Sequence, residues 1–242
     1  MKNKTLLIVI PLIIHLIIVV MGSIAIISQA FSSPGSNNAV SVSGVNIFRY
    51  FTIDGNIFII LASIVISIFL ILKKETKISY ILHLMAAVSA LLIFLTVVIV
   101  LLPYFGSMLL HGYKMIVLHA TNPMLCVISF LFVYKDKISK KMAILGILPM
   151  AVYGFFALLF CFTKVWSESL IPYPFLEVYD NPWYESLLFI VGMFGGCILT
   201  SILLSIISRK LYIVNMNKKG LIITGSILFL VIIGIVLLLI LI

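Results

Sequence analysis

Long apolar runs separated by short polar segments constrain this chain more than any other feature of its sequence. Seven such runs occupy residues 5–29, 48–72, 79–102, 115–134, 142–163, 185–208 and 221–242. Each has roughly the 20 residues that a helix needs to cross a hydrocarbon core about 30 Å thick. Only 10% of the 242 residues are charged, against about 25% in soluble domains, so most of the chain must face lipid. We therefore predict an all-α, polytopic transmembrane helix bundle of about seven spans, forming a single transmembrane domain over 1–242.

The basic residues predict the orientation, because cytoplasmic loops of membrane proteins are enriched in Lys and Arg. With a cytoplasmic N-terminus, 13 of the 16 basic residues fall inside: Lys2, Lys4, Lys73, Lys74, Lys77, Lys135, Lys137, Lys140, Lys141, Arg209, Lys210, Lys218 and Lys219. Arg49, Lys114 and Lys164 remain outside. The apolar stretch 6–27 exceeds the core of about 7–15 residues in a signal peptide, so we expect the first helix to be retained.

These features predict a multi-pass protein of the plasma membrane with cytoplasmic basic loops, and the Lys, Ile and Asn usage favours a bacterial membrane. The net charge of +9 is spread over loops rather than gathered on one face. We therefore expect membrane lipids as partners and no nucleic acid. Cys126, Cys161 and Cys197 lack metal-ligand spacing and lie inside apolar runs, as packing residues do.

Polar residues at membrane depth are costly and usually face the bundle interior or a cavity. The first group, at the outer end of the second run, is Thr52, Asp54 and Asn56. Thr52 and Asn56 share one helix face, whereas Asp54 points elsewhere. Two interpretations remain open for this segment. It forms part of a functional site, or Thr52 or Asp54 caps free N–H groups where the helix begins.

The second group lies in the fourth run, where His119 precedes Pro123 by four residues. Proline inside a helix clashes with the carbonyl four residues back, so the helix should open at His119. Asn122 offers a partner for the freed groups. At 1.5 Å per residue, Thr52 and His119 both fall in the outer half of the membrane. A neutral histidine near a hydroxyl is the minimum pair for activating an oxygen nucleophile, but a kinked span with an internally bonded histidine fits equally well.

Other polar or small residues suggest weaker features. His15 lies near mid-membrane and is either a packed neutral histidine or part of a pathway, and we expect His83 to be interfacial. His111 lies two turns outward from His119 and would extend a site there. The glycines of the sixth run, Gly192, Gly195 and Gly196, suggest close helix packing. No zinc-protease, phosphate-loop or nucleotide-binding motif is present in the sequence.

Three segments together resemble the androgen-induced membrane protein family, which includes the androgen-dependent regulator of tissue factor pathway inhibitor and bacterial relatives. They are the Phe51-Thr52 pair in 50–56, the Leu110-His111-Gly112 segment with His119 after it, and the Tyr-Pro-Phe-Leu-Glu run from Tyr173 to Glu177. The resemblance covers residues 1–208, six helices, so 209–242 would hold an additional C-terminal helix.

The resemblance implies a threonine-dependent hydrolase that cleaves fatty acid esters of hydroxy fatty acids. The implied catalytic residues are Thr52 as nucleophile and His119 as base. On this hypothesis Asn56 or Asn122 would donate to the oxyanion, and Tyr173 and Glu177 would shape the outer rim. Asp54 and His111 complete the set of expected substrate-binding residues, and neither a metal nor a cofactor is required. The alternative is a non-catalytic small transporter, immunity protein or membrane scaffold.

Overall fold

A computed structural model describes residues 2–32, 43–74, 76–133, 140–176 and 182–215. These residues form an all-helical structure that contains six helices long and apolar enough to cross a membrane. The six candidate spans are Ile8–Ala30, Phe51–Ile71, Lys77–Leu101, Tyr113–Leu131, Met142–Phe162 and Tyr184–Leu211. They coincide with the first six predicted runs. The seventh predicted run, 221–242, and Glu177 lie outside the described residues.

The long helices are α1 (Lys2–Ala30), α2 (Phe51–Ile71), α3 (Lys77–Leu95), α6 (Asn122–Val133), α8 (Leu148–Phe162) and α9 (Trp183–Asn215). Short helices complete the spans and loops: α4 (Leu102–Phe105), α5 (Tyr113–Ile116) and α7 (Lys140–Ile144). Shorter turns are η1 (Gly44–Arg49), η2 (Thr96–Leu101), η3 (Gly106–Leu110), η4 (Val117–Thr121), η5 (Leu145–Ile147), η6 (Glu168–Leu170) and η7 (Pro174–Leu176).

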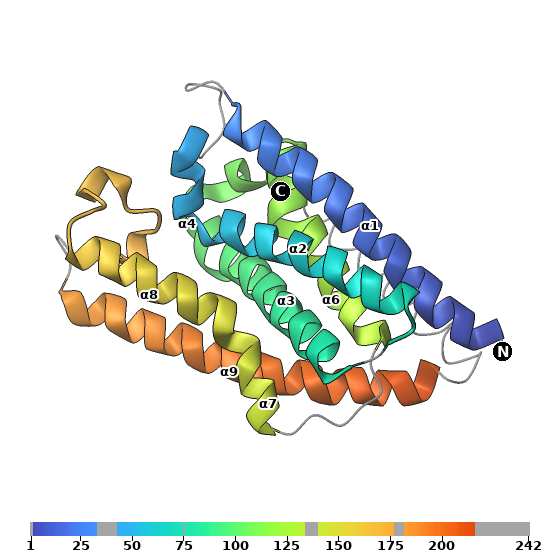
Figure 1. Ribbon diagram of the computed structural model, residues 1–242. Helices are drawn as coiled ribbons and strands as arrows, with labels where there is room; N and C mark the ends of the chain where they lie inside the picture. Colours follow the sequence, from blue (N-terminus) through green and yellow to red (C-terminus); the bar gives the residue numbers. More distant parts are fainter. Residues whose placement is uncertain (1, 33–42, 75, 134–139, 177–181, 216–242) are drawn as a thin grey trace.

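Helices α1, α2, α3 and α6 pack together, and α8 and α9 lie along the other side of α3 (Figure 1). The core between them is apolar, with Ile59, Leu84, Ala87, Cys126 and Phe130 fully buried. Many large apolar side chains point outward instead, including Leu16 on α1 and Leu188 on α9, which are more than 60% exposed. In water such a surface would be unstable, but it suits contact with acyl chains. The structure therefore supports an integral membrane protein.

The segments predicted to lie outside gather at one end of the bundle. Arg49, just before α2, donates from Nη1 to the carbonyl of Leu170 at 2.6 Å, which ties η1 to the loop before α9. The Tyr153 hydroxyl of α8 donates to the Arg49 carbonyl at 2.7 Å. Lys114 donates to the Ser32 hydroxyl at 2.5 Å. These bonds connect the segment before α2 with α8 and with the loop before α9, and α5 with the segment after α1.

Prolines mark two breaks in the regular helical hydrogen bonding. The π-helical turn η2 ends just before Pro103, and the π-helical turn η4 ends just before Pro123. Proline has no N–H and its ring clashes with the preceding turn, so the backbone widens there. The second turn contains His119, which is the position where the sequence predicted an opening. The break at η2 was not predicted.

The close helix approaches involve different glycines from those expected. A Cβ built on Gly192, Gly195 or Gly196 would meet no atom within 4 Å, so these residues of α9 face away from the described neighbours. The expected close packing at this stripe is therefore not found among the described residues. Gly22 on α1 makes the close approach instead, because a Cβ there would overlap the Asn122 side chain and come within 2.9 Å of Ile60. Helix α1 thus packs against α2 and α6 at Gly22.

Candidate functional site

The π turn before Pro123 leaves one main-chain carbonyl without a partner in its own helix. The N–H of Asn122 bonds to the carbonyl of Val117, five residues back, instead of that of Leu118. The next residue, Pro123, has no N–H to offer. The Leu118 carbonyl is buried among helices, where an unpaired polar group is expensive. It therefore needs a donor from another helix.

Asn56 of α2 supplies that donor. Its Nδ2 atom lies 2.9 Å from the Leu118 carbonyl oxygen and 2.7 Å from the carbonyl oxygen of Thr52. Its Oδ1 atom accepts a hydrogen bond from Nδ2 of Asn122 at 3.3 Å. Asn56 and Asn122 are both fully buried. One amide thus joins the main chain at Thr52 to the main chain next to His119, and its protons are already engaged inside the protein.

Thr52 lies in the first turn of α2 and is only 8% exposed. The N-cap of α2 is Tyr50, and it makes no side-chain capping bond. The interpretation of Thr52 or Asp54 as a capping residue is therefore wrong. The N–H of Thr52 instead donates to the hydroxyl of Tyr173 at 3.4 Å. Tyr173 comes from the loop between α8 and α9, so this loop covers the outer end of α2.

The Tyr173 hydroxyl stays protonated at neutral pH. Burial raises the pKa of this phenol to about 12, although its hydrogen bonds with Thr52 oppose the rise. The ring stacks on Phe175 with centroids 4.9 Å apart, and Phe175 stacks on Phe189 of α9 at 4.0 Å. These stacked rings hold the hydroxyl over Thr52. Tyr173, predicted to shape the outer rim, contacts the main chain of Thr52.

His119 lies in the π turn η4 and is 6% exposed. Its Nδ1 atom is 3.1 Å from the carbonyl oxygen of Leu109. A carbonyl can only accept a hydrogen bond, so in the neutral ring Nδ1 carries the proton. The other nitrogen, Nε2, then has the lone pair that a general base requires. The Leu109 carbonyl therefore selects the tautomer in which Nε2 is basic.

Two hollows adjoin the outer part of α2. The small one, about 20 Å³, is lined by Thr52 and Tyr173 together with residues of α3, α8 and α9; His119 is not among its lining residues. The larger one, about 540 Å³, runs along α2 and α8 and includes Asp54. Phe51 and Tyr153 line both. We call the larger hollow the α2–α8 groove.

The remaining predicted site residues are not all in one place. Asp54 is half-buried in the α2–α8 groove, on the side of α2 that does not carry Asn56. His111 is exposed between η3 and α5. Glu177 lies outside the described part of the chain. The structure therefore gathers Thr52, Asn56, Asn122 and Tyr173 into one hydrogen-bonded group, with His119 beside its Leu118 contact.

A second polar cluster lies deeper in the bundle, and sequence analysis did not assemble it. His15 of α1 is fully buried, with Nδ1 3.0 Å from the Ser63 hydroxyl and Nε2 2.8 Å from the Ser129 hydroxyl. His83 is also fully buried, with its ring centroid 4.9 Å from that of His15. His83 is therefore enclosed among helices, and its depth in the membrane stays a prediction. The four residues come from α1, α2, α3 and α6, so only the packed bundle brings them together.

Comparison of the chain with protein-family models, with curated proteins and with solved structures finds no match. The family resemblance drawn from three short segments therefore stays a prediction. Among the residues that the structure describes, no group of three or more His, Cys, Asp or Glu side chains is placed to hold a metal ion. The groups available for chemistry around α2 are a threonine, a histidine, a tyrosine and two amides.

Proposed function

We propose that this integral membrane protein is a lipid-ester hydrolase that uses Thr52 as nucleophile and His119 as general base. The observation that carries the proposal is the double hydrogen bond of Asn56 to the carbonyls of Thr52 and Leu118. This pair of bonds fixes the first turn of α2, which carries the Thr52 hydroxyl, next to η4, which carries the His119 imidazole. Both side chains are buried, which excludes bulk water from the nucleophile.

The chemistry follows from the groups present. The Thr52 Oγ1 atom attacks the ester carbonyl carbon while Nε2 of His119 accepts the hydroxyl proton. The Tyr173 hydroxyl, beside Thr52, donates to the oxyanion that forms on the carbonyl oxygen. Collapse of this intermediate expels the alcohol, which takes the proton from His119. Water, activated by the same imidazole, then releases the fatty acid from Thr52.

Tyr173 suits the oxyanion role better than the amides proposed from sequence. The Nδ2 protons of Asn56 already bond to two main-chain carbonyls, and Nδ2 of Asn122 bonds to Asn56. Withdrawing either amide would break the link between α2 and η4. The Tyr173 hydroxyl accepts from the Thr52 N–H at 3.4 Å, and it keeps its own proton at neutral pH, so in this proposal that proton is available to the oxyanion. In this mechanism the asparagines position the site rather than stabilise charge.

The test is hydrolysis of long-chain esters by the purified protein in lipid nanodiscs, together with labelling by a fluorophosphonate probe. We expect Thr52→Ala to lower the rate by at least about 10³-fold and His119→Ala by a similar factor. Thr52→Ser should retain labelling, because it keeps the hydroxyl. Thr163→Ala is the matched control, since Thr163 is an exposed threonine at the end of α8. Equal rates and labelling for the wild type and Thr52→Ala would refute Thr52 as the nucleophile. Absence of both hydrolysis and labelling in the wild type would refute the proposal and favour the non-catalytic alternative.

A further inference from the structure

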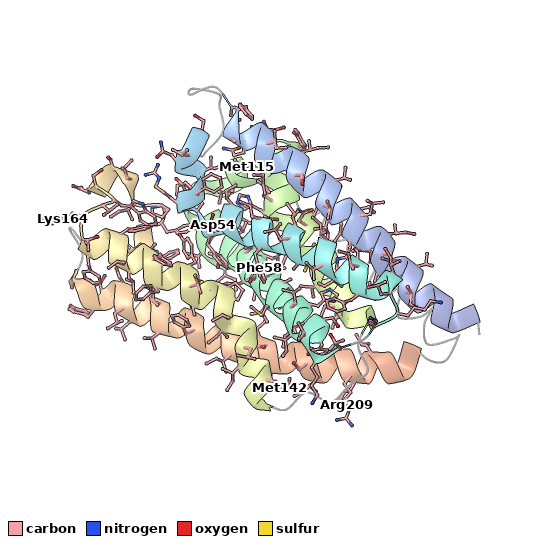
Figure 2. All side chains as sticks on the ribbon, in the orientation of Figure 1. Asp54, Phe58, Met115, Met142, Lys164 and Arg209 are labelled. Atoms are coloured by element: carbon pink, nitrogen blue, oxygen red, sulfur yellow. The ribbon has the colours of Figure 1, made fainter. Side chains whose placement is uncertain are left out.

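The α2–α8 groove is largely apolar, and Asp54 is the one charged residue among its described lining residues. Its walls include the aromatic rings of Phe48, Phe51, Phe58, Tyr153 and Trp166. Figure 2 shows Asp54 and Phe58 one turn apart on α2. The volume of about 540 Å³ is within the range of small-molecule sites. Side chains at its edge, such as Phe48 and Phe156, are about half exposed, so a lipid can enter sideways.

Asp54 has no protein group to neutralise it among the described residues. No hydrogen bond or ion pair of its carboxylate is found there. Arg49, the basic residue closest in sequence, directs two of its five guanidinium N–H groups to the carbonyls of Asn46 and Leu170, and neither of these bonds goes to Asp54. The Tyr153 hydroxyl donates to the Arg49 carbonyl. The Arg49 guanidinium and the Tyr153 hydroxyl thus bond to the main chain instead of to the Asp54 carboxylate.

A carboxylate at membrane depth without a partner is costly, and such residues usually mark a site for a ligand or an ion. The faces of aromatic rings attract cations, and proteins bind quaternary ammonium groups in aromatic cages. A carboxylate beside such rings adds direct charge attraction. An anionic lipid head would be repelled by Asp54. The chemistry of the groove therefore favours a positively charged ligand with an apolar tail.

We propose that the α2–α8 groove binds a single-chain lipid with an ammonium group, whose charge lies beside Asp54 and whose alkyl chain lies along α2 and α8. The proposal deepens the proposed function, on which it rests only for the ligand's role as substrate. The groove and the Thr52 cavity share Phe51 and Tyr153. The substrate class would then be a fatty acyl ester of an amino alcohol.

Binding can be measured through Trp166, because the chain has only two tryptophans and Trp166 lines the groove. In a Trp183→Phe protein in neutral nanodiscs, a long-chain alkyltrimethylammonium probe with a brominated chain should quench Trp166 fluorescence in a saturable manner. A glucoside with the same brominated chain is the neutral comparison. We expect the cationic probe to bind about tenfold more tightly, a difference of about 1.4 kcal/mol.

Asp54→Asn keeps the shape of the groove and should abolish this preference, while Glu168→Gln should preserve it. Glu168 is an exposed carboxylate of the same outer loops and controls for general surface attraction. Equal affinities for both probes, or a preference that survives Asp54→Asn, would overturn the proposal. So would a preference lost equally in Glu168→Gln.

The same titration in Thr52→Ala separates this inference from the proposed function. If Thr52→Ala keeps the preference for the cationic probe and the wild type hydrolyses no ester, the groove ligand is supported and the threonine mechanism is refuted. Hydrolysis that depends on Thr52, with no preference for the cationic probe, refutes the groove ligand alone.

Discussion

Asn56 shows how one side chain sets the geometry of two helices. Its amide satisfies a Leu118 carbonyl that the π turn exposes, and it also holds the Thr52 carbonyl in its own helix. Without it, the Leu118 carbonyl would be a buried acceptor with no donor, because Pro123 cannot supply one. A residue of this kind contributes to stability and to the placement of the site at once.

We therefore predict that Asn56→Ala lowers the free energy of unfolding by about 1–2 kcal/mol, the cost of a buried carbonyl left unpaired. Unfolding by denaturing detergent, followed by circular dichroism, measures it. Ser67→Ala is the control on the same helix, since the Ser67 hydroxyl bonds only to the Ser63 carbonyl one turn back. If Asn56→Ala is as stable as Ser67→Ala, the bridge has no energetic role.

At the scale of residues, the sequence indicates which polar side chains matter for the fold better than it predicts their contacts. The position of Pro123 was enough to expect an opening beside His119. It could not show that Asn56 fills that opening, because this depends on how α2 rotates against α6. For the same reason, the depth of His83 in its own helix did not reveal its contact with His15, whose side chain reaches it from α1.

Among the elements, α1 owes its position to one small residue. Gly22 allows α1 to approach Ile60 of α2 and Asn122, where any Cβ would overlap a neighbour. In membranes, where lipid and protein interiors are equally apolar, such close approach is a main source of helix association. The stripe of glycines on α9 has no such neighbour among the described residues.

Two matched substitutions test this contrast. Gly22→Ala should destabilise the protein by about 1–3 kcal/mol, because Ile60 and Asn122 must move. Gly192→Ala, in open space on α9, should be neutral or stabilising by up to about 1 kcal/mol, because alanine favours the helix. Thermal melting of the two variants in the same detergent gives the comparison. Equal melting temperatures would show that α1 does not depend on Gly22.

The positions of the helices along the chain were largely predictable, but the side of each helix that faces its neighbours was not. Hydrophobic length alone predicted the six helices that the structure describes as candidate spans. Which glycines approach a neighbour depends on the rotation of each helix about its own axis. In a span that is apolar on every side, periodicity gives no signal for that rotation.

For the molecule as a whole, the basic residues predict an orientation in the membrane, and the arrangement of the helices is compatible with it. Lys164 and Arg209 lie at opposite ends of the bundle (Figure 2), as they must if the first is outside and the second cytoplasmic. The hydrogen bonds of Arg49, Tyr153 and Lys114 collect the predicted outer segments at one end. Which end faces the cytoplasm stays a prediction from charge.

Cysteine labelling of intact cells tests that direction. The three native cysteines are buried, so the wild type should react little with a membrane-impermeant maleimide. Ser167→Cys, in the loop after α8, should be labelled from outside. Lys74→Cys, after α2, should be labelled only once the membrane is opened. The reverse pattern would show that the N-terminus lies outside.

The buried histidine cluster has a consequence for how the chain is made. Helix α1, which carries His15, leaves the ribosome before the helices that carry Ser63 and Ser129. Until both helices have arrived, the imidazole lacks at least one of these hydroxyls, which favours holding the nascent α1 at the insertion machinery instead of releasing it early into lipid. We therefore expect α1 to stay beside the insertion machinery until the helix that carries Ser129 is delivered.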